Sequence, residues 1–121
     1  MAPEILADDL DTSIFSNYCR ADIYSMALVY WEIIQRTRLG AGYTPPAYQQ
    51  PYEAYVQSDP SIEEMKIIVV DRKCRPKFEA QIEKIPIMKK LIMVTEECWM
   101  GVANARLPAL RIKKSIGSIS V

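Results

Sequence analysis

Residues 20–37, RADIYSMALVYWEIIQRT, contain neither glycine nor proline and predict a long helix. Asp22 would stand in the first turn of this helix, where a carboxylate suits the helix dipole. The apolar side chains go almost all the way round it: Ile23, Met26, Ala27, Leu28, Val29, Tyr30, Trp31, Ile33 and Ile34. A helix that is apolar on every side belongs in an interior, so we expect other elements to bury it.

The residues on either side of this helix lack a helical period. Residues 1–19 read as a loop with turn chemistry. Residues 38–58 hold three prolines, two glycines and four tyrosines, and they predict one long inter-helix loop. Loops of this length in a compact domain are usually functional or dock onto another element.

A second helix is predicted within residues 59–72. Ser61 and Glu64 have the spacing of a capping box, and Pro60 fits the first turn. The side chains at helical spacing form one apolar face: Ile62, Met65, Ile68 and Val69. The following stretch, RKCRPKF at 72–78, reads as a turn-rich connection.

Two more helices complete an all-α prediction. One runs from about Pro86 to Trp99, and the other begins near Pro108. The predicted apolar face of the first comprises Met88, Leu91, Ile92, Thr95, Cys98 and Trp99; that of the second comprises Ala109, Ile112, Ile116 and Ile119. The chain therefore reads as four helices and one long loop, within a single domain.

Composition excludes several classes of function. The 15 basic and 15 acidic residues balance, which argues against nucleic acid as the main partner. The chain has no histidine, the commonest general base and a frequent zinc ligand. No phosphate-binding glycine motif and no Cys-x-x-Cys pair occurs, so we expect no catalytic, cofactor-binding or metal-binding residue here. Apolar runs are too short to span a bilayer, and we expect this segment to make no membrane contact.

The three cysteines, Cys19, Cys74 and Cys98, are widely spaced and odd in number. This pattern favours reduced thiols in the cytosol. We expect all three to be small packing residues.

Several motifs occur in the order found in protein kinases. They are APE at residues 2–4, DIYSMALVYWEI at 22–33, SDPSIEEMK at 58–66, RP at 75–76, ECW at 97–99 and ARLPALRIKK at 105–114. Together they resemble the C-terminal lobe of a protein kinase, from the APE motif onward. The longer matches are similar to the type I receptor serine/threonine kinases of the TGF-β, activin and BMP family. The resemblance covers essentially all of residues 1–121, which would form one partial kinase domain beginning inside the lobe.

The resemblance implies structural roles for three residues. Glu4, the last residue of APE, would pair with Arg106 and fix the end of the activation segment. Asp22 would accept hydrogen bonds from the backbone of the catalytic loop. The alternatives are an unpaired surface Glu and Arg, and a plain helix-start charge at Asp22. Trp31 and Trp99 are expected to be packing residues.

The resemblance also implies the activity of the parent protein. It would transfer phosphate from ATP, with Mg²⁺ or Mn²⁺, to Smad-type substrates, and a type II receptor would activate it. It would lie on the cytoplasmic side of the plasma membrane as part of a single-pass receptor. The glycine-rich loop, the ATP-pairing lysine, H-R-D and D-F-G are absent from residues 1–121, so we expect the isolated chain to be inactive. The chain would supply the scaffold of the lobe, with residues 59–72 as a docking helix.

Two other readings remain open. A non-catalytic helical module could act as a truncated receptor, and it would then be cytosolic. Alternatively, Pro45, Pro46 and Tyr48 match a PPxY ligand of WW domains, which bind extended proline-preset segments. An unrelated four-helix bundle is disfavoured, because the helix at 20–37 lacks a polar face. Without further elements to cover that helix, we expect an exposed apolar patch and marginal stability or aggregation.

Overall fold

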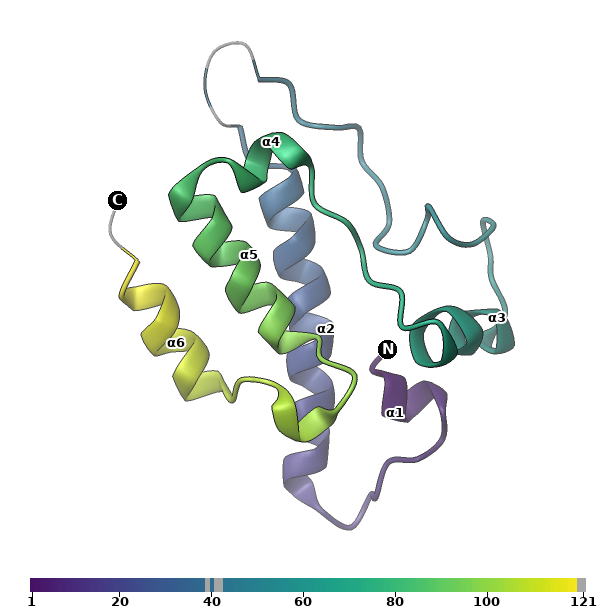
Figure 1. Cartoon of the computed structure of the whole chain (residues 1–121). Coiled ribbons are helices and arrows are strands. Elements are labelled where there is room, and N and C mark those ends of the chain that lie inside the picture. Colours follow the sequence, from purple (N-terminus) through teal and green to yellow (C-terminus); the bar gives the residue numbers. More distant parts are fainter. Residues whose placement is uncertain (39, 41–42, 120–121) are drawn as a thin grey trace.

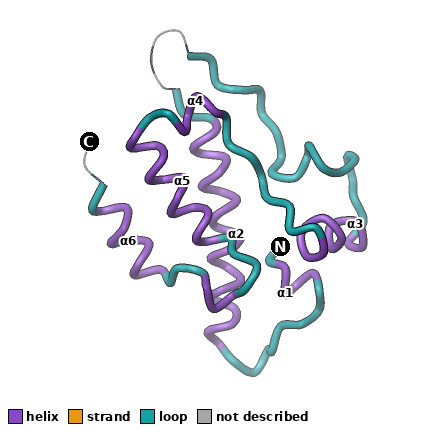
Figure 2. Tube along the Cα trace, viewed as in Figure 1, coloured by secondary structure: helices purple, strands orange, loops and turns teal. Residues whose placement is uncertain are grey.

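The computed structural model describes residues 1–38, 40 and 43–119, and every regular element among them is a helix (Figures 1 and 2). The elements are α1 (Pro3–Leu6), α2 (Phe15–Gln35), α3 (Ile62–Lys66), the π-helical η1 (Ile67–Asp71), α4 (Ala80–Glu83), α5 (Pro86–Cys98), the 3₁₀ turn η2 (Ala103–Ala105) and α6 (Ala109–Gly117). The all-α prediction is confirmed. None of the helices in these described ranges is long and apolar enough to cross a membrane.

The prediction of a loop over residues 1–19 is wrong in two places, where the structure has helix. The first is α1, which begins at Pro3 because the pyrrolidine ring presets a helical φ and its missing N–H is not needed in the first turn. The second is α2, which begins at Phe15 rather than near residue 20. Asp22 therefore lies about two turns inside α2, beyond the reach of the helix dipole at its start. The reading of Asp22 as a helix-start charge is thus wrong.

The core lies where α2 packs against α5, with α6 beside α5 (Figure 1). Tyr24, Ala27 and Trp31 on α2 are buried in a cluster that includes Cys98 and Val69. A second cluster joins the end of α2 to α4 and α5 through Ile34, Ile82, Met88 and Ile92. The short α1 contacts α3 and η1 on the other side of α2.

Burial of α2 on every side is a prediction that the structure contradicts. A row of large apolar side chains along one side of α2 is exposed: Phe15, Tyr18, Met26, Val29 and Ile33. We call this row the α2 stripe. Phe15, Val29 and Ile33 are 80%, 55% and 60% exposed, respectively. The described elements pack against the rest of the α2 surface, so nothing among them covers the stripe.

The helix predicted within residues 59–72 is present, but its register changes midway. Ser61 caps α3, since its Oγ accepts a hydrogen bond from the Glu64 N–H at 3.1 Å. The chain then widens into the π-helix η1, where a turn holds one extra residue and rotates the following side chains. Ile68 and Val69 are therefore buried, whereas Ile62 is exposed, contrary to the single predicted face.

The two later helices agree in position with the sequence prediction. Helix α5 spans Pro86–Cys98 and buries Met88, Ile92, Thr95 and Cys98, as expected. In α6, Ile112 is buried but Ala109 and Ile116 are exposed, because α6 contacts the rest through a narrow strip. The one-turn helix α4 was not predicted, since its four residues are too few for a visible period.

The three cysteines differ in how deeply they are buried. Cys98 is fully buried, and burial raises the pKa of its thiol to about 11, as suits a packing residue. Cys74 is half-buried, while Cys19 is exposed, so the prediction of a packing role is wrong for Cys19. All three are free in the structure.

Candidate functional site

Helix α1 places Glu4 beside the centre of the fold. Ala2, in extended conformation with φ −62° and ψ 150°, precedes the helix and is completely buried. Leu6, at the end of α1, is also buried. The apolar side chains thus hold α1 against the core, and the carboxylate of Glu4 is directed toward Arg106.

Glu4 and Arg106 form a bidentate ion pair. The Nη2 of Arg106 lies 2.8 Å from Oε1 of Glu4, and its Nη1 lies 2.8 Å from Oε2. The Arg106 side chain is 0% exposed and that of Glu4 is 15% exposed. Two parallel charge-assisted hydrogen bonds fix both distance and angle, so this pair orients α1 as well as holding it.

Arg106 also binds two backbone carbonyl groups. Its Nε donates to the oxygen of Met100 at 2.8 Å, and its Nη1 donates to the oxygen of Arg20 at 2.9 Å. One guanidinium therefore joins α1, α2 and the segment after α5. Arginine suits this position because its planar fork carries several donors in fixed directions.

The pair shifts the ionisation of Glu4. Burial opposes the charged form and would raise the pKa of Glu4. Hydrogen bonds and the positive charge of Arg106 act in the opposite direction and outweigh it, so the pKa is lowered. Glu4 is consequently a carboxylate at neutral pH.

Tyr24 lies between two guanidinium groups. The central carbon atoms of Arg75 and Arg106 each lie 5.1 Å from the centroid of the Tyr24 ring, a cation–π distance. Tyr24 is fully buried, and its hydroxyl shares a short hydrogen bond with that of Tyr52. Burial raises the pKa of both phenols, so both stay neutral.

A second arginine, Arg75, also joins separate segments, and it does so through hydrogen bonds to backbone oxygen atoms. Its Nε donates to Trp99 at 2.9 Å, and its Nη1 donates to Val69 at 3.1 Å and to Cys74 at 2.8 Å. It thus ties the end of η1 to the end of α5. Together, Arg75, Tyr24 and Arg106 connect η1, α2 and α1 in one contiguous cluster.

Asp22 is exposed on α2. No hydrogen bond or ion pair joins its carboxylate to any other residue that the structure describes. It lies between Tyr18 and Met26 in sequence, on the same side of α2 as the stripe. Its carboxylate oxygens are accordingly accessible along the uncovered side of the helix.

Trp31 and Trp99 are both buried. The Trp31 indole Nε1 donates to the backbone oxygen of Lys77 at 2.9 Å. Trp99 stacks on Phe78 with ring centroids 5.8 Å apart. Both tryptophans hold the connection between η1 and α4 against the helices.

Pro45, Pro46 and Tyr48 lie in the part of the long loop that follows the undescribed residues 41–42. The two prolines are half-buried, and the Tyr48 side chain is exposed. Pro46 lies beside Gln35 at the end of α2, whereas Glu4 is joined through Arg106 to the Arg20 carbonyl near the start of α2. The structure thus separates the PPxY segment from the ion pair.

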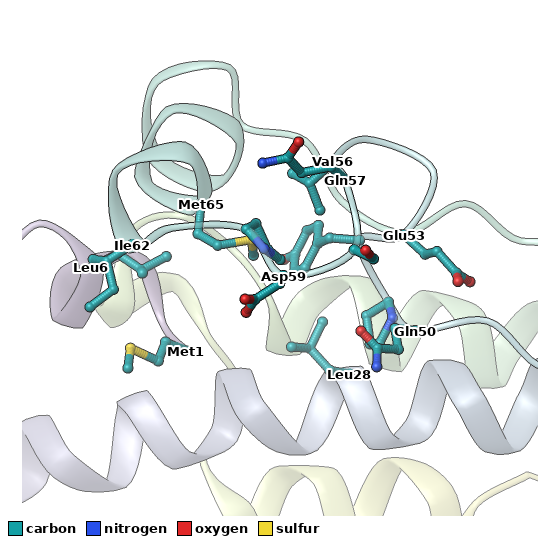
Figure 3. Close-up of a pocket in the computed structure, with 14 residues that line it drawn as sticks. Met1, Leu6, Leu28, Gln50, Glu53, Val56, Gln57, Asp59, Ile62 and Met65 are labelled. Atoms are coloured by element: carbon teal, nitrogen blue, oxygen red, sulfur yellow. The ribbon is translucent and has the colours of Figure 1, made fainter.

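A pocket of about 680 Å³ opens between α1, α2, α3 and the end of the long loop (Figure 3). Leu6, Leu28 and Met65 contribute apolar surface. Glu53 and Asp59 are the acidic residues among those that line it, and Asp59 has a φ of 99°. The pocket therefore lies directly beside the helix that carries Glu4.

No protein-family model matches the chain. Among curated proteins, the human activin receptor type-1C is 46% identical over 121 residues, which is 100% of this chain and 24% of the receptor. The human TGF-beta receptor type-1 is 41% identical over 120 residues, or 99% of this chain and 24% of the receptor. The human activin receptor type-1B is 41% identical over 121 residues, with the same shares as type-1C.

The chain is homologous to the C-terminal part of the activin and TGF-beta type I receptors. The resemblance seen in the sequence motifs is thereby confirmed. The chain spans about a quarter of the length of these relatives, which are receptor serine/threonine kinases. The helical architecture agrees with the C-terminal lobe of a protein kinase.

Sequence reasoning missed part of the cluster around these helices. Arg75 was noticed only as half of an RP dipeptide and Tyr52 only as one of the loop tyrosines, and Tyr24 was not singled out. Their contacts join positions far apart in the chain, which helical periodicity does not report. The sequence did not mark Arg75 as the buried one, since Arg72, Lys73 and Lys77 in the same connection are basic as well.

Proposed function

We propose that the chain is the scaffold part of the kinase domain of a TGF-β superfamily type I receptor. The parent protein transfers phosphate from ATP to serine residues of Smad-type substrates. Residues 1–121 then form one partial domain, the C-terminal lobe after the activation segment, with residues 38–58 as its long internal loop. The observation that carries the proposal is identity of 41–46% over the whole chain to type I receptors.

Glu4 and Arg106 have the proposed role of fixing the end of the activation segment. The bidentate geometry and the burial of Arg106 support this role, since such a pair holds one orientation of α1. Phosphoryl transfer depends on positioning, so a segment that holds the substrate hydroxyl must itself be held.

Asp22 has the proposed role of anchoring the catalytic loop. Its carboxylate is exposed in the middle of α2 and lies alongside the α2 stripe. An exposed apolar row with an acceptor in its midst suits a surface that another part of the protein covers. The preceding part of the parent would bury the stripe and donate backbone N–H groups to Asp22.

The face around α3 is the proposed docking side. Residues 59–72 present an exposed Ile62 and border the 680 Å³ pocket beside α1 (Figure 3). A protein substrate that docks here would lie next to the end of the activation segment. This proximity supports, for residues 59–72, the role of a docking helix.

ATP and its metal ion are proposed to bind elsewhere in the parent. The described residues contain no group of three or more His, Cys, Asp or Glu side chains that could hold a metal ion. We propose that these residues carry out no catalytic step and that the isolated chain is inactive. The activating partner would be a type II receptor, and the location would be the cytoplasmic side of the plasma membrane.

A phosphate-transfer assay tests this proposal. The endogenous protein is captured with an antibody to residues 59–72 and incubated with labelled ATP, Mg²⁺ and a purified Smad-type protein. We expect phosphate on serine of the substrate from the captured material and none from the recombinant 121-residue chain. Absence of transfer from captured full-length material would contradict the proposed activity.

A second candidate, a non-catalytic module, is favoured by one observation. The α2 stripe leaves Phe15, Val29 and Ile33 exposed, and such a surface binds other protein chains. A truncated receptor of this kind would compete with the intact kinase for partners. Co-expression of the chain with an intact type I receptor would then reduce Smad phosphorylation, and a variant with Val29→Gln and Ile33→Lys in the stripe would not.

A further inference from the structure

The long loop carries an exposed segment to which the kinase proposal gives no role. Residues 45–48 read Pro-Pro-Ala-Tyr, and the Tyr48 side chain is 59% exposed. Ala47 and Gln49 beside it are exposed as well. A tyrosine this exposed contributes little to the core, so its environment leaves it free to bind another molecule.

A half-buried tyrosine and a buried tyrosine hold the loop on either side of this segment. Tyr43 packs against the cluster of Ile34 and Met88 at the end of α2. Tyr52 is buried and hydrogen-bonds to Tyr24. Between these anchors the chain runs along the outside of the helices, away from α5 and α6 (Figure 1). The loop is therefore fixed at both ends, and in its middle Tyr48 is exposed while Pro45 and Pro46 are half-buried, with Pro46 next to Gln35 of α2. A partner that takes both prolines would have to lift this part of the loop from α2.

The backbone of this middle part is unpaired. None of the hydrogen bonds between described residues involves the backbone of residues 44–49, and no helix or strand is assigned there. A polyproline II segment has these properties, because it forms no internal hydrogen bonds. Pro45 and Pro46 restrict their own φ angles to that region, which lowers the entropy lost on binding. With three residues per turn, positions 45 and 48 would lie on one side.

We propose that residues 45–48 form a ligand for a WW domain of the class that binds Pro-Pro-x-Tyr. The aromatic-lined groove of such a domain would receive the prolines and the exposed Tyr48 ring. Residues 43–52 carry no charged side chain, which suits a groove that works through aromatic packing. The segment does not suit an SH3 domain, since Tyr48 stands where a Pro-x-x-Pro ligand has its second proline. This inference does not rest on the proposed kinase function.

A titration tests the proposal directly. The 121-residue chain is added to an isotope-labelled, PPxY-binding WW domain, and the resonances of the WW groove are followed. We expect saturable shifts confined to the groove. Tyr48→Ala should weaken binding about tenfold or more, which corresponds to about 1.4 kcal/mol. Pro46→Ala should weaken it in the same direction.

Matched controls separate recognition from folding. Thr44→Ala and Gln49→Ala change exposed residues that flank the motif, and both should bind as the unmodified chain does. The helical circular dichroism of every variant should be unchanged. Absence of saturable shifts, or a Tyr48→Ala chain that binds as tightly as the unmodified one, would overturn the proposal. Equal binding to an SH3 domain would overturn it as well.

Discussion

Glu4 and Arg106 lie 102 positions apart in the chain, and each of two guanidinium nitrogens lies 2.8 Å from a different carboxylate oxygen. The same guanidinium lies over the ring of Tyr24, whose other neighbour is Arg75. The first helix of the chain, its central helix and the connection before its last helix therefore meet at one side chain. Loss of this contact should therefore first destabilise the packing of α1 against the core.

Glu4→Ala should release α1 from the core. The substitution leaves a fully buried guanidinium without its anion, which costs about 3 kcal/mol. Hydrogen exchange at the Leu6 and Ala7 amides, which bond to the carbonyls of Ala2 and Pro3, reports this loss directly. Asp9→Ala is the control, because Asp9 is exposed, and it should leave protection unchanged. Retained protection in Glu4→Ala would contradict a structural role for the pair.

The same contact should weaken in acid. Because the pKa of Glu4 is lowered in the folded chain, its contribution is fully present above the ordinary value of 4.5 and is lost as the pH falls through the folded value. Protection of the α1 amides, corrected for intrinsic exchange, should therefore fall below about pH 4.5. Glu4→Gln should lack this part of the pH dependence, and an identical profile in both chains would refute the assignment.

The isolated chain should associate through the α2 stripe. Val29 and Ile33 are large, apolar and exposed, and such a surface self-associates in water. Light scattering should show oligomers for the unmodified chain and a monomer for the double substitution Val29→Gln and Ile33→Lys, with equal helical content. Ile34→Lys is the matched control, since Ile34 is buried and its replacement should unfold the chain. A monomeric unmodified chain that unfolds reversibly and cooperatively would contradict this prediction.

Arg75 should matter for stability as much as the ion pair does. Arg75→Ala leaves the Val69 and Trp99 carbonyls without their donor and removes a cation from the Tyr24 ring. We expect a loss of about 2–4 kcal/mol in the free energy of unfolding. Urea denaturation measures this loss, with Arg75→Ala introduced into the chain that already carries Val29→Gln and Ile33→Lys. Arg72→Ala, an exposed neighbour, should change it by less than about 0.5 kcal/mol.

Replacement of Asp22 should leave the stability of the 121-residue chain unchanged and should reduce phosphate transfer by the parent. Its carboxylate has no partner among the described residues, so Asp22→Asn should change the stability of the chain by less than about 0.5 kcal/mol. In the parent it should strongly reduce phosphate transfer with little effect on ATP binding. Glu32→Gln on the same helix is the control. Equal activity of Asp22→Asn and the unmodified parent would remove the anchoring role.

Local patterns predicted the elements, and distant contacts explain the errors. Helix α5 was predictable because it starts at Pro86 and keeps one apolar face. Ile62 was misplaced because the π-helical turn after α3 shifts the register, and no simple period encodes that shift. The apolar α2 was expected to be covered on all sides, whereas the described elements leave the α2 stripe exposed. The cluster of Arg75 and Tyr24 could not be predicted, since its contacts depend on how separate helices pack.

The most direct test of the central claim is the intact mass of the endogenous protein captured through residues 59–72. Since the chain corresponds to 24% of the length of its relatives, a receptor kinase should have about four times the 13.8 kDa mass of the chain. We predict a species of that size. A single endogenous species of 13.8 kDa, with none heavier, would contradict the account and favour the non-catalytic module.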